Sequence, residues 1–186
     1  MSRSLAALRS GVRSPLAPPN ILKMKKSISL IGMAGAGKSS IGVKLADYLK
    51  FDFIDSDELI ETNQNNSLQE VLAKNGIQEF KKIEEAAILS IEFSQTILAT
   101  GGSAIFSQNA MNHIKNNSSV VFLEVSFEDI VDRIPDFSNR GFIKEANQTM
   151  QQAFNERESI YREFADHIVP NHEGIESCFN KILSII

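Results

Sequence analysis

The sequence predicts an α/β fold, a three-layer sandwich in which helices cover both faces of a parallel sheet. Five short runs of apolar and β-branched residues alternate with segments whose apolar residues recur at helical spacing. The first run, "SISLIGM" (27–33), ends at a glycine-rich turn that leads directly into a helical pattern, as expected of a buried parallel strand. Both observations favour one doubly wound domain.

The remaining elements follow in the same way. Strands are expected in the ranges 27–33, 51–57, 95–103, 119–126 and 167–171. Helices are expected at 38–49, 67–75, 78–90, from 126 onward, at 150–165 and at 176–186. The sequence "SLQE" from Ser67 has the pattern of a capping box, and Gly76 separates two helical stretches. Residues 134–148 have little periodicity and are expected to form a mobile loop.

Length and composition are typical of one globular domain. The chain has 186 residues, of which 42% are hydrophobic and 23% charged. No apolar run approaches the roughly 18 residues of a membrane span, so no membrane partner is expected, and the predicted location is the cytoplasm. The single cysteine, Cys178, excludes an internal disulfide and a multi-cysteine zinc site, and we expect it only to pack.

Charge is distributed unevenly along the chain, whose formal net charge is −4. Up to Ala46 there are eight Lys and Arg and no acidic residue, whereas from Asp47 onward 23 acidic residues outnumber 11 basic ones. Phosphate contacts need a basic face, so this acidic domain is not expected to bind nucleic acid. A small anionic substrate would have to be held by a few well-placed cations.

Residues 1–23 differ in composition from the rest, being rich in Arg, Ser, Ala and Pro. Three interpretations stay open: an organelle transit peptide, which would place the protein in a plastid or other organelle, an over-long start with Met24 as the true beginning, and a disordered tail. We therefore expect residues 1–23 to be a disordered or targeting extension and residues 24–186 to form the domain.

The turn after the first strand has the pattern of a phosphate-binding loop. Gly32, Gly37, Lys38 and Ser39 satisfy G-x-x-x-x-G-K-[ST]. Glycines let backbone amides turn toward phosphate oxygens, and the following helix N-terminus adds partial positive charge. Lys38 would bridge the β- and γ-phosphates, and the Ser39 hydroxyl would bind magnesium. Because a strand precedes the loop and a helix follows it, the sequence predicts a nucleotide-binding P-loop.

Polar and glycine residues follow two other predicted strands. Asp55 and Asp57 end the second strand, at the edge where a doubly wound sheet binds ligands. A carboxylate there can hold magnesium through water or accept the proton of an attacking hydroxyl. A solvated loop with a helix cap at Asp57 explains the same pattern equally well. Gly101 and Gly102 after the third strand permit close approach of a ligand, or merely form a turn.

Two arginines are further candidates. Arg140, in the 134–148 loop, has the position of a lid cation that closes over ATP and neutralises the migrating phosphoryl group. Arg157 lies on the following helix, four residues before Tyr161. On pattern alone, both are better explained as ordinary surface residues.

Taken together, these motifs resemble those of shikimate kinases. From Ser27 to the C-terminus, the order "GMAGAGKS", "DSD", "FKKIE", "GGS", "NRGF" and "RESIY" is similar to that of the family. The resemblance implies a P-loop kinase of the nucleoside-monophosphate-kinase type, with a five-stranded parallel sheet in the order 2-3-1-4-5. It also implies a monomeric enzyme that uses ATP and Mg²⁺ to phosphorylate the 3-hydroxyl of shikimate, in the pathway to chorismate and the aromatic amino acids.

The same resemblance implies roles for the matching residues. Those expected to act in catalysis are Lys38, Asp55, Asp57 and Arg140. Those expected to bind the nucleotide are Gly35, Ala36, Gly37, Lys38, Ser39, Ser40, Arg133 and Arg140, with Arg133 beside the adenine. Those expected to bind shikimate are Asp57, Lys81, Gly101, Gly102 and Arg157, the last at its carboxylate. Those expected to hold the metal are Ser39 and Asp55.

The sequence departs from the family pattern in its acceptor half. Lys81 stands where the family has an arginine in "FRxxE". A lysine keeps the positive charge but loses the bidentate geometry of a guanidinium. Ser103 replaces the third glycine of "GGG" and could crowd the substrate or add a hydrogen bond. In addition, "RGF" replaces "RPL", and "NHEG" lacks the usual Arg/Pro adenine clamp.

These departures keep other functions open beside an active shikimate kinase. One is a kinase of the same fold with a different hydroxyl acceptor, and another is a nucleotide-binding or regulatory module without phosphotransfer. The second is disfavoured because the expected catalytic residues are all present. A GTPase switch is disfavoured because no N-K-x-D guanine signature occurs.

Overall fold

A parallel sheet forms the middle layer of the computed structural model, which describes residues 27–134, 144 and 147–186. Its strands are β1 (Ser27–Ile31), β2 (Asp52–Asp55), β3 (Thr96–Ala99), β4 (Ser118–Glu124) and β5 (His167–Pro170). The five strands lie in the order β2-β3-β1-β4-β5, and every neighbouring pair is parallel. The predicted fold class and strand order are therefore confirmed.

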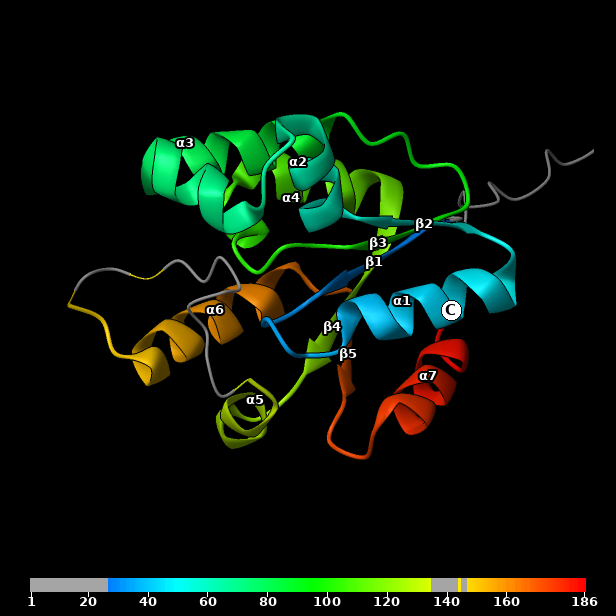
Figure 1. Ribbon diagram of the computed structural model, residues 1–186. Coiled ribbons are helices and arrows are strands. Elements are labelled where there is room, and N and C mark those ends of the chain that lie inside the picture. The colour runs from blue at the N-terminus through cyan, green and yellow to red at the C-terminus, as the bar shows by residue number, and fades with distance from the viewer. Residues whose placement is uncertain (1–26, 135–143, 145–146) are drawn as a thin grey trace, which may run out of the picture.

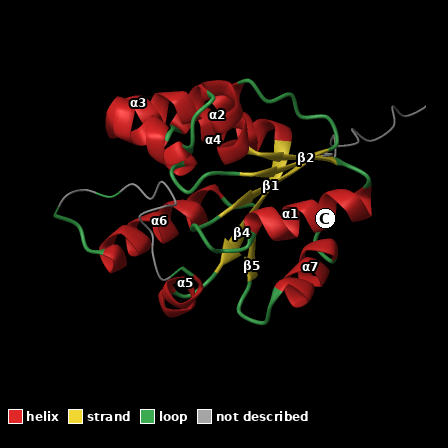
Figure 2. Ribbon diagram, viewed as in Figure 1, coloured by secondary structure: helices red, strands yellow, loops and turns green. Residues whose placement is uncertain are grey.

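Helices cover both faces of this sheet (Figures 1 and 2). They are α1 (Lys38–Leu49), α2 (Ser56–Gln64), α3 (Leu68–Leu89), the 3-10 turn η1 (Ala104–Phe106), α4 (Gln108–Asn117), α5 (Phe127–Arg133), α6 (Met150–Phe164) and α7 (Ile175–Leu183). Helices α1 and α7 pack against each other on one face, while α3, α4 and α6 gather around η1 on the other. Among the described residues, no helix has the length and apolar character needed to cross a membrane.

The central strand, β1, is buried in the core and pairs with a neighbouring strand on each side. All five residues of β1 are buried, and Leu30 pairs with Ala99 on one side and with Val121 on the other. A parallel strand covered on both faces needs such an apolar run. The buried Ser29 satisfies its hydroxyl by a 2.6 Å hydrogen bond with that of Ser118.

Chain crossover brings distant loops to one edge of the sheet. β1 and β2 are consecutive in sequence, but β3 lies between them. In parallel strands all carboxyl ends point the same way, so the turns after β1, β2 and β3 share one edge. These are the turns that carry the P-loop, the two aspartates and the glycine pair of the sequence analysis.

The described helices agree with the sequence in detail at several termini. Ser67 and Glu70 form the predicted capping box of α3. Gly76 has a φ of 74° and a ψ of 170°, so it breaks the helical backbone where the sequence predicted separate helices. Cys178 is buried in α7, as expected of a packing residue.

Two helices were absent from the sequence prediction. α2 begins directly after β2 and is capped by Asp55, whose side chain accepts from the Asp57 amide at 3.0 Å. The cap is therefore Asp55 and not Asp57. α4 was missed because its sequence, "QNAMNHIKNN", is dominated by polar residues, although Ala110, Met111 and Ile114 form one buried stripe.

Candidate active site

The P-loop folds as a tight turn between β1 and α1. Gly37 has a φ of 91° and caps α1, and Gly35 has a φ of 80°. Side chains are strained in this left-handed region, which explains the glycines. A Cβ on Gly35 would also lie 2.7 Å from Cδ1 of Ile134, the residue after α5, so a side chain there would have to displace Ile134. The loop is thus shaped by backbone geometry and close packing together.

Lys38 lies within this loop and is buried. Its ammonium donates to the backbone carbonyls of Gly32 at 2.9 Å and Met33 at 2.8 Å. These bonds hold a positive charge next to the turn of backbone amides. An anionic oxygen is a stronger acceptor for an ammonium than a neutral carbonyl, so phosphate can compete for this group.

Ser39 and Asp55 meet across the sheet edge. The Ser39 hydroxyl donates to Oδ2 of Asp55 at 2.6 Å, and Asp55 Oδ1 caps α2. Both residues line a hollow of about 270 Å³ together with Asp57, Glu58 and others. Within the described residues, no cluster of three or more His, Cys, Asp or Glu side chains could hold a metal. The hydroxyl of Ser39 and the carboxylate of Asp55 are nevertheless a pair of hard oxygen donors.

Two carboxylates converge on Gly101. A Cβ on this residue would lie 2.3 Å from Oε1 of Glu84 and 2.6 Å from Oδ1 of Asp57. The Gly101 amide also donates to the buried hydroxyl of Ser56 at 2.7 Å. Gly101 is needed because the two acids occupy the space of a side chain. Asp57 and Gly101, both predicted substrate-binding residues, are thus brought together.

Glu84 is buried and hydrogen-bonded to Ser103, whose hydroxyl donates to Oε2 at 2.6 Å. Burial raises the pKa of Glu84 to about 7, the Ser103 bond opposes this rise, and nearby Asp57 adds to it. Lys81 and Arg157 both attract the carboxylate. Glu84 lies within the quoted motif "FKKIE", but the sequence analysis gave it no role.

Three side chains from separate elements surround the turn after β3. Arg157 on α6 is buried, and its guanidinium carbon lies 5.0 Å from the centroid of the Phe106 ring. Lys81 on α3 places its Nζ 4.7 Å from the same centroid. Burial lowers the pKa of Arg157, but a guanidinium stays charged at neutral pH. Two cations therefore approach one ring.

Tyr161 supports the same turn from α6. Its hydroxyl donates to the Gly102 carbonyl at 3.0 Å, and its ring stacks on Phe122 with centroids 5.1 Å apart. Burial raises the pKa of Tyr161, so the phenol stays a donor at neutral pH. The motif "RESIY" thus carries a cation and, one helical turn later, the residue that holds Gly102 in place.

Arg133 and Asn171 join the P-loop to the loop after β5. The Arg133 guanidinium donates to the Asn171 carbonyl at 2.7 Å and to the Gly35 carbonyl at 3.4 Å. The buried Asn171 side chain donates to the Ala36 carbonyl at 2.8 Å. Sequence reasoning missed Asn171, although a polar residue directly after the last strand lies at the ligand-binding edge.

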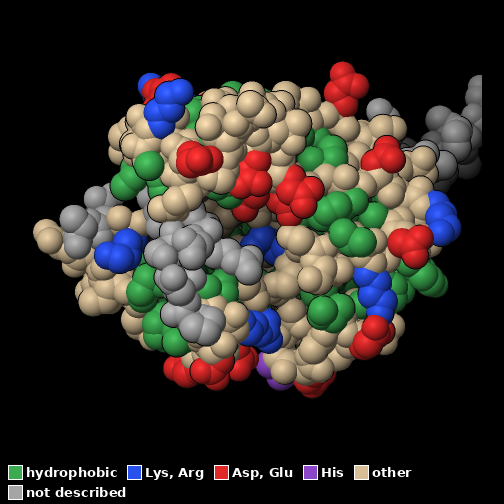
Figure 3. Space-filling model, in the orientation of Figure 1, with side chains coloured by type: hydrophobic (Ala, Val, Ile, Leu, Met, Phe, Trp, Pro, Cys, Tyr) green, Lys and Arg blue, Asp and Glu red, His purple; other side chains and the backbone are tan. Residues whose placement is uncertain are grey.

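The predicted residues therefore fall into adjacent groups. The nucleotide group comprises the P-loop residues and Arg133, and the acceptor group comprises Asp57, Lys81, Gly101, Gly102 and Arg157. Ser40 is exposed on the first turn of α1, and Arg140 lies outside the described residues. Figure 3 shows acidic side chains along one rim of a central hollow and basic side chains within and below it.

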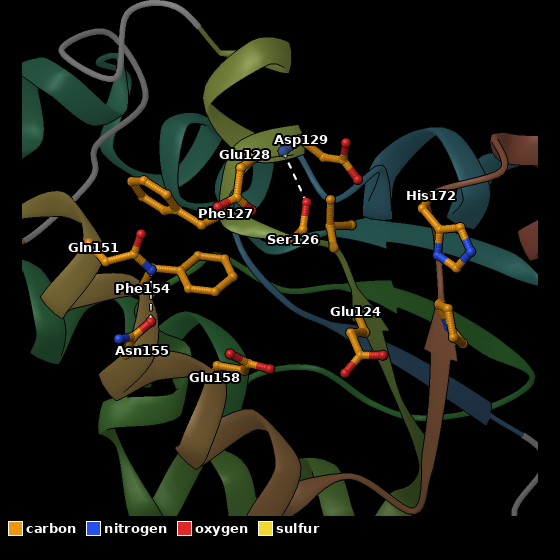
Figure 4. A pocket seen from close by; sticks show the side chains of 12 residues that line it. Glu124, Ser126, Phe127, Glu128, Asp129, Gln151, Phe154, Asn155, Glu158 and His172 are labelled. Atoms are coloured by element: carbon orange, nitrogen blue, oxygen red, sulfur yellow. Dashed lines mark hydrogen bonds between the residues drawn. The ribbon is translucent and has the colours of Figure 1, made fainter.

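A second cavity, of about 620 Å³, lies between α5 and α6. Figure 4 shows its acidic side chains, which include Glu124, Glu128 and Glu158, around the paired rings of Phe127 and Phe154. Arg162 pairs with Glu124 and Glu158. No predicted site residue lines this cavity, whereas Ser39, Asp55 and Asp57 line the smaller hollow. The smaller hollow beside Ser39 is the better place for the chemistry.

The parallel sheet, the strand order and the P-loop define a P-loop kinase. Comparison with known families agrees, since the family model described as shikimate kinase matches residues 34–186. A shikimate kinase of Francisella tularensis subsp. novicida is 34% identical over 166 residues, which cover 87% of this chain and 94% of the relative. A shikimate kinase of a Sulfurihydrogenibium species is 33% identical over 138 residues, which cover 74% of this chain and 83% of the relative.

Solved structures give the same result. A shikimate kinase from Acinetobacter baumannii, in complex with shikimate, aligns with a TM-score of 0.78 at 28% identity, over 88% of this chain and 93% of that one. The shikimate kinase from Aquifex aeolicus aligns with a TM-score of 0.74 at 29% identity, over 85% of this chain and 94% of that one. The chain belongs to the shikimate kinase family, so the predictions of family and of a kinase are confirmed.

Proposed function

We propose that this protein transfers the γ-phosphoryl group of ATP to the 3-hydroxyl of shikimate. One observation carries the proposal. Next to the P-loop, an acidic pair (Asp57 and Glu84) and a basic pair (Lys81 and Arg157) surround the turn after β3. A polyhydroxylated carboxylic acid needs acceptors for its hydroxyls and cations for its carboxylate, and this arrangement offers both.

In the donor half, the P-loop amides and Lys38 would bind the β- and γ-phosphates. The amides at the start of α1 point into the loop, and Lys38 is buried beside them. Charge in phosphoryl transfer develops on the phosphate oxygens, so a preorganised cation at this place lowers the barrier. Arg140, predicted as a second cation over the transferring group, stays a prediction.

In the acceptor half, Asp57 is the better proton acceptor of the two aspartates. Asp57 lies against Gly101 in the acceptor group, whereas Asp55 lies next to Ser39 beside the P-loop. The 3-oxygen of shikimate would form a bond to the γ-phosphorus as the bond to the β–γ bridging oxygen breaks. The hydroxyl proton would pass to the Asp57 carboxylate, leaving ADP and shikimate 3-phosphate.

Lys81 and Arg157 would bind the substrate carboxylate. Arg157 is buried and Lys81 is half-buried, which strengthens their attraction for an anion relative to exposed side chains. Ser103 does not need to crowd the substrate, since its hydroxyl is engaged with Glu84. This supports shikimate over a different acceptor, while Lys81 remains the departure that favours testing other hydroxy acids.

Magnesium fits Ser39 and Asp55. Mg²⁺ prefers oxygen ligands, keeps several waters and is completed by substrate phosphates, so two protein oxygens beside the P-loop suffice. When bound, the metal would neutralise charge on the phosphate oxygens. Removing it with a chelator should abolish turnover, and added Mg²⁺ should restore it. A monomer in the cytoplasm, or in an organelle if residues 1–23 are a transit peptide, completes the proposal.

The test is a coupled assay of ADP release with the full chain, shikimate and a panel of other hydroxy acids. We expect shikimate-dependent turnover, and a large loss, of about 100-fold or more, in a Lys38→Met control. No shikimate-dependent ADP at millimolar substrate would refute the proposal. Turnover with another acid would support the different-acceptor kinase, and ATP binding without any turnover would support the inactive module.

A further inference from the structure

Phe106 stands at a junction of three elements. It is the last residue of η1, is half-buried, and follows Ser103 in the turn after β3. Both α3 and α6 contact η1, and each helix sends one cation to the ring. None of the motifs in the sequence includes Phe106.

We propose that Phe106 is a positioning residue for the carboxylate of the substrate, because its ring holds Lys81 and Arg157 at a common binding site. This inference rests on the proposed function. The centroid distances of 4.7 and 5.0 Å are within the range in which an aromatic ring attracts a cation. The two helices are separate in sequence, and the ring is a shared partner of their cations.

The ring offsets electrostatic repulsion between the two cations. Two positive groups that approach the same small anion also repel each other when the anion is absent. Glu84 attracts both cations, but its pKa of about 7 means that its carboxyl carries only part of a negative charge near neutral pH. The negative face of an aromatic ring adds attraction without titrating. The attraction of the Phe106 ring for the two cations therefore does not depend on the protonation of Glu84.

The ring also restricts Lys81. A lysine side chain has a flexible stem and no fork of donors, so its ammonium is poorly fixed in space on its own. Contact with an aromatic ring limits the positions that it can take. The backbone that carries the ring is fixed, because the Phe106 amide donates to the Ser103 carbonyl at 3.0 Å and the Ser107 amide to the Ala104 carbonyl at 3.1 Å, and Phe106 packs against the hydrophobic core.

Packing is the alternative explanation, since Phe106 also contacts the hydrophobic core. The two roles can be separated with Phe106→Leu, which keeps an apolar side chain but removes the ring, and Phe106→Tyr, which keeps the ring. Phe93→Leu is a matched control, because Phe93 is another partly buried ring on the same core and contacts His113 instead of the site.

The experiment measures kcat and the KM values of shikimate and ATP for the full chain and these variants. Phe106→Leu should raise the shikimate KM about threefold to thirtyfold, the range of a cation–π contact, with kcat and the ATP KM changed less than twofold. Phe106→Tyr and Phe93→Leu should stay within about twofold of the parent KM. An unchanged shikimate KM in Phe106→Leu, or an equal rise in Phe93→Leu, would overturn the inference.

A double-mutant cycle with Lys81→Met tests whether Phe106 acts through the cations. With one cation gone, Phe106→Leu should raise the shikimate KM by a smaller factor than in the parent. An equal factor in both backgrounds would overturn the inference and assign Phe106 to packing.

Calorimetric titration with shikimate separates this inference from the proposed function. Binding that weakens in Phe106→Leu and not in Phe106→Tyr supports the positioning role even if the parent shows no turnover, which would refute the kinase proposal alone. Turnover with no change in Phe106→Leu refutes the positioning role alone. A parent chain that neither binds nor phosphorylates shikimate refutes both.

Discussion

The Ser103 hydroxyl donates a 2.6 Å hydrogen bond to the Glu84 carboxylate, and both side chains are buried. This bond links the turn after β3 to α3, the helix that also carries Lys81. Ser103 is the residue at which the chain departs from the glycine pattern of its family. Its side chain is directed to Glu84, so the departure adds an internal contact to the acceptor site.

Ser103→Ala should destabilise the protein. Removing the hydroxyl leaves a buried carboxyl without this donor, which typically costs about 1–3 kcal/mol of unfolding free energy. Urea denaturation measures it, with Ser177→Ala as the control. Ser177 bonds to Glu173 on the exposed surface, and its loss should change stability by about 0.5 kcal/mol or less. Equal effects of the two substitutions would contradict the structural importance of the Ser103 bond.

Glu84→Gln should remove a pH dependence of stability. The folded-state pKa of about 7 lies above the ordinary value of 4.5, so the folded protein binds more protons than the unfolded chain between these values. Stability of the parent relative to Glu84→Gln should therefore fall as pH rises from 4.5 to 7, by on the order of 3 kcal/mol, and then level off.

Glu85→Gln provides the control for this titration. Hydrogen bonds from Ser107 and Asn109 lower the pKa of Glu85, so its contribution is lost only at more acidic pH. The parent should not lose stability relative to Glu85→Gln between pH 4.5 and 7. Urea titrations at several pH values compare the variants, and a flat or rising difference for Glu84→Gln would contradict the account.

Gly101→Ala should be far more disruptive than Gly102→Ala. A Cβ at Gly101 would meet the carboxylates of Glu84 and Asp57 at 2.3 and 2.6 Å, whereas one at Gly102 finds no atom closer than 3.8 Å. Overpacking of this kind typically costs about 1–3 kcal/mol. Thermal unfolding of both variants checks the difference. Similar melting temperatures would show that the carboxylates move aside freely.

Lys81→Arg should lower the shikimate KM, by roughly tenfold, because a guanidinium can make two parallel bonds to a carboxylate and can still stack on Phe106. Lys82→Arg is the matched control, since the exposed Lys82 pairs with Glu79. Steady-state kinetics with shikimate as the varied substrate decide the point. An unchanged KM in Lys81→Arg would mean that Lys81 does not face the carboxylate.

Much of the fold could be predicted because its signals are local. The glycine spacing of the P-loop, the apolar run of β1 and the capping box at Ser67 each lie within a few residues. The sequence missed α4, whose buried stripe is only Ala110, Met111 and Ile114 in a polar segment. It also missed α2, because strand and helix there are separated by a single cap, Asp55.

Individual residues of the candidate site could be predicted only where they are part of a recognised sequence motif. The contacts among Glu84, Ser103 and Phe106 were not predictable, because they join segments that approach only when α3, η1 and α6 pack together. A buried carboxyl and a ring between two cations have no sequence signature of their own. Tertiary packing, and not local pattern, determines these parts of the acceptor site.

The most direct test of the central claim is identification of the phosphorylated product. The full chain, ATP, Mg²⁺ and shikimate would be incubated, and the product examined by mass spectrometry and by ³¹P NMR coupling to the ring protons. The account predicts shikimate carrying one phosphate on its 3-oxygen, formed in equal amount to ADP and absent in Lys38→Met. ADP formed without phosphorylated shikimate, or phosphate on another oxygen, would contradict it.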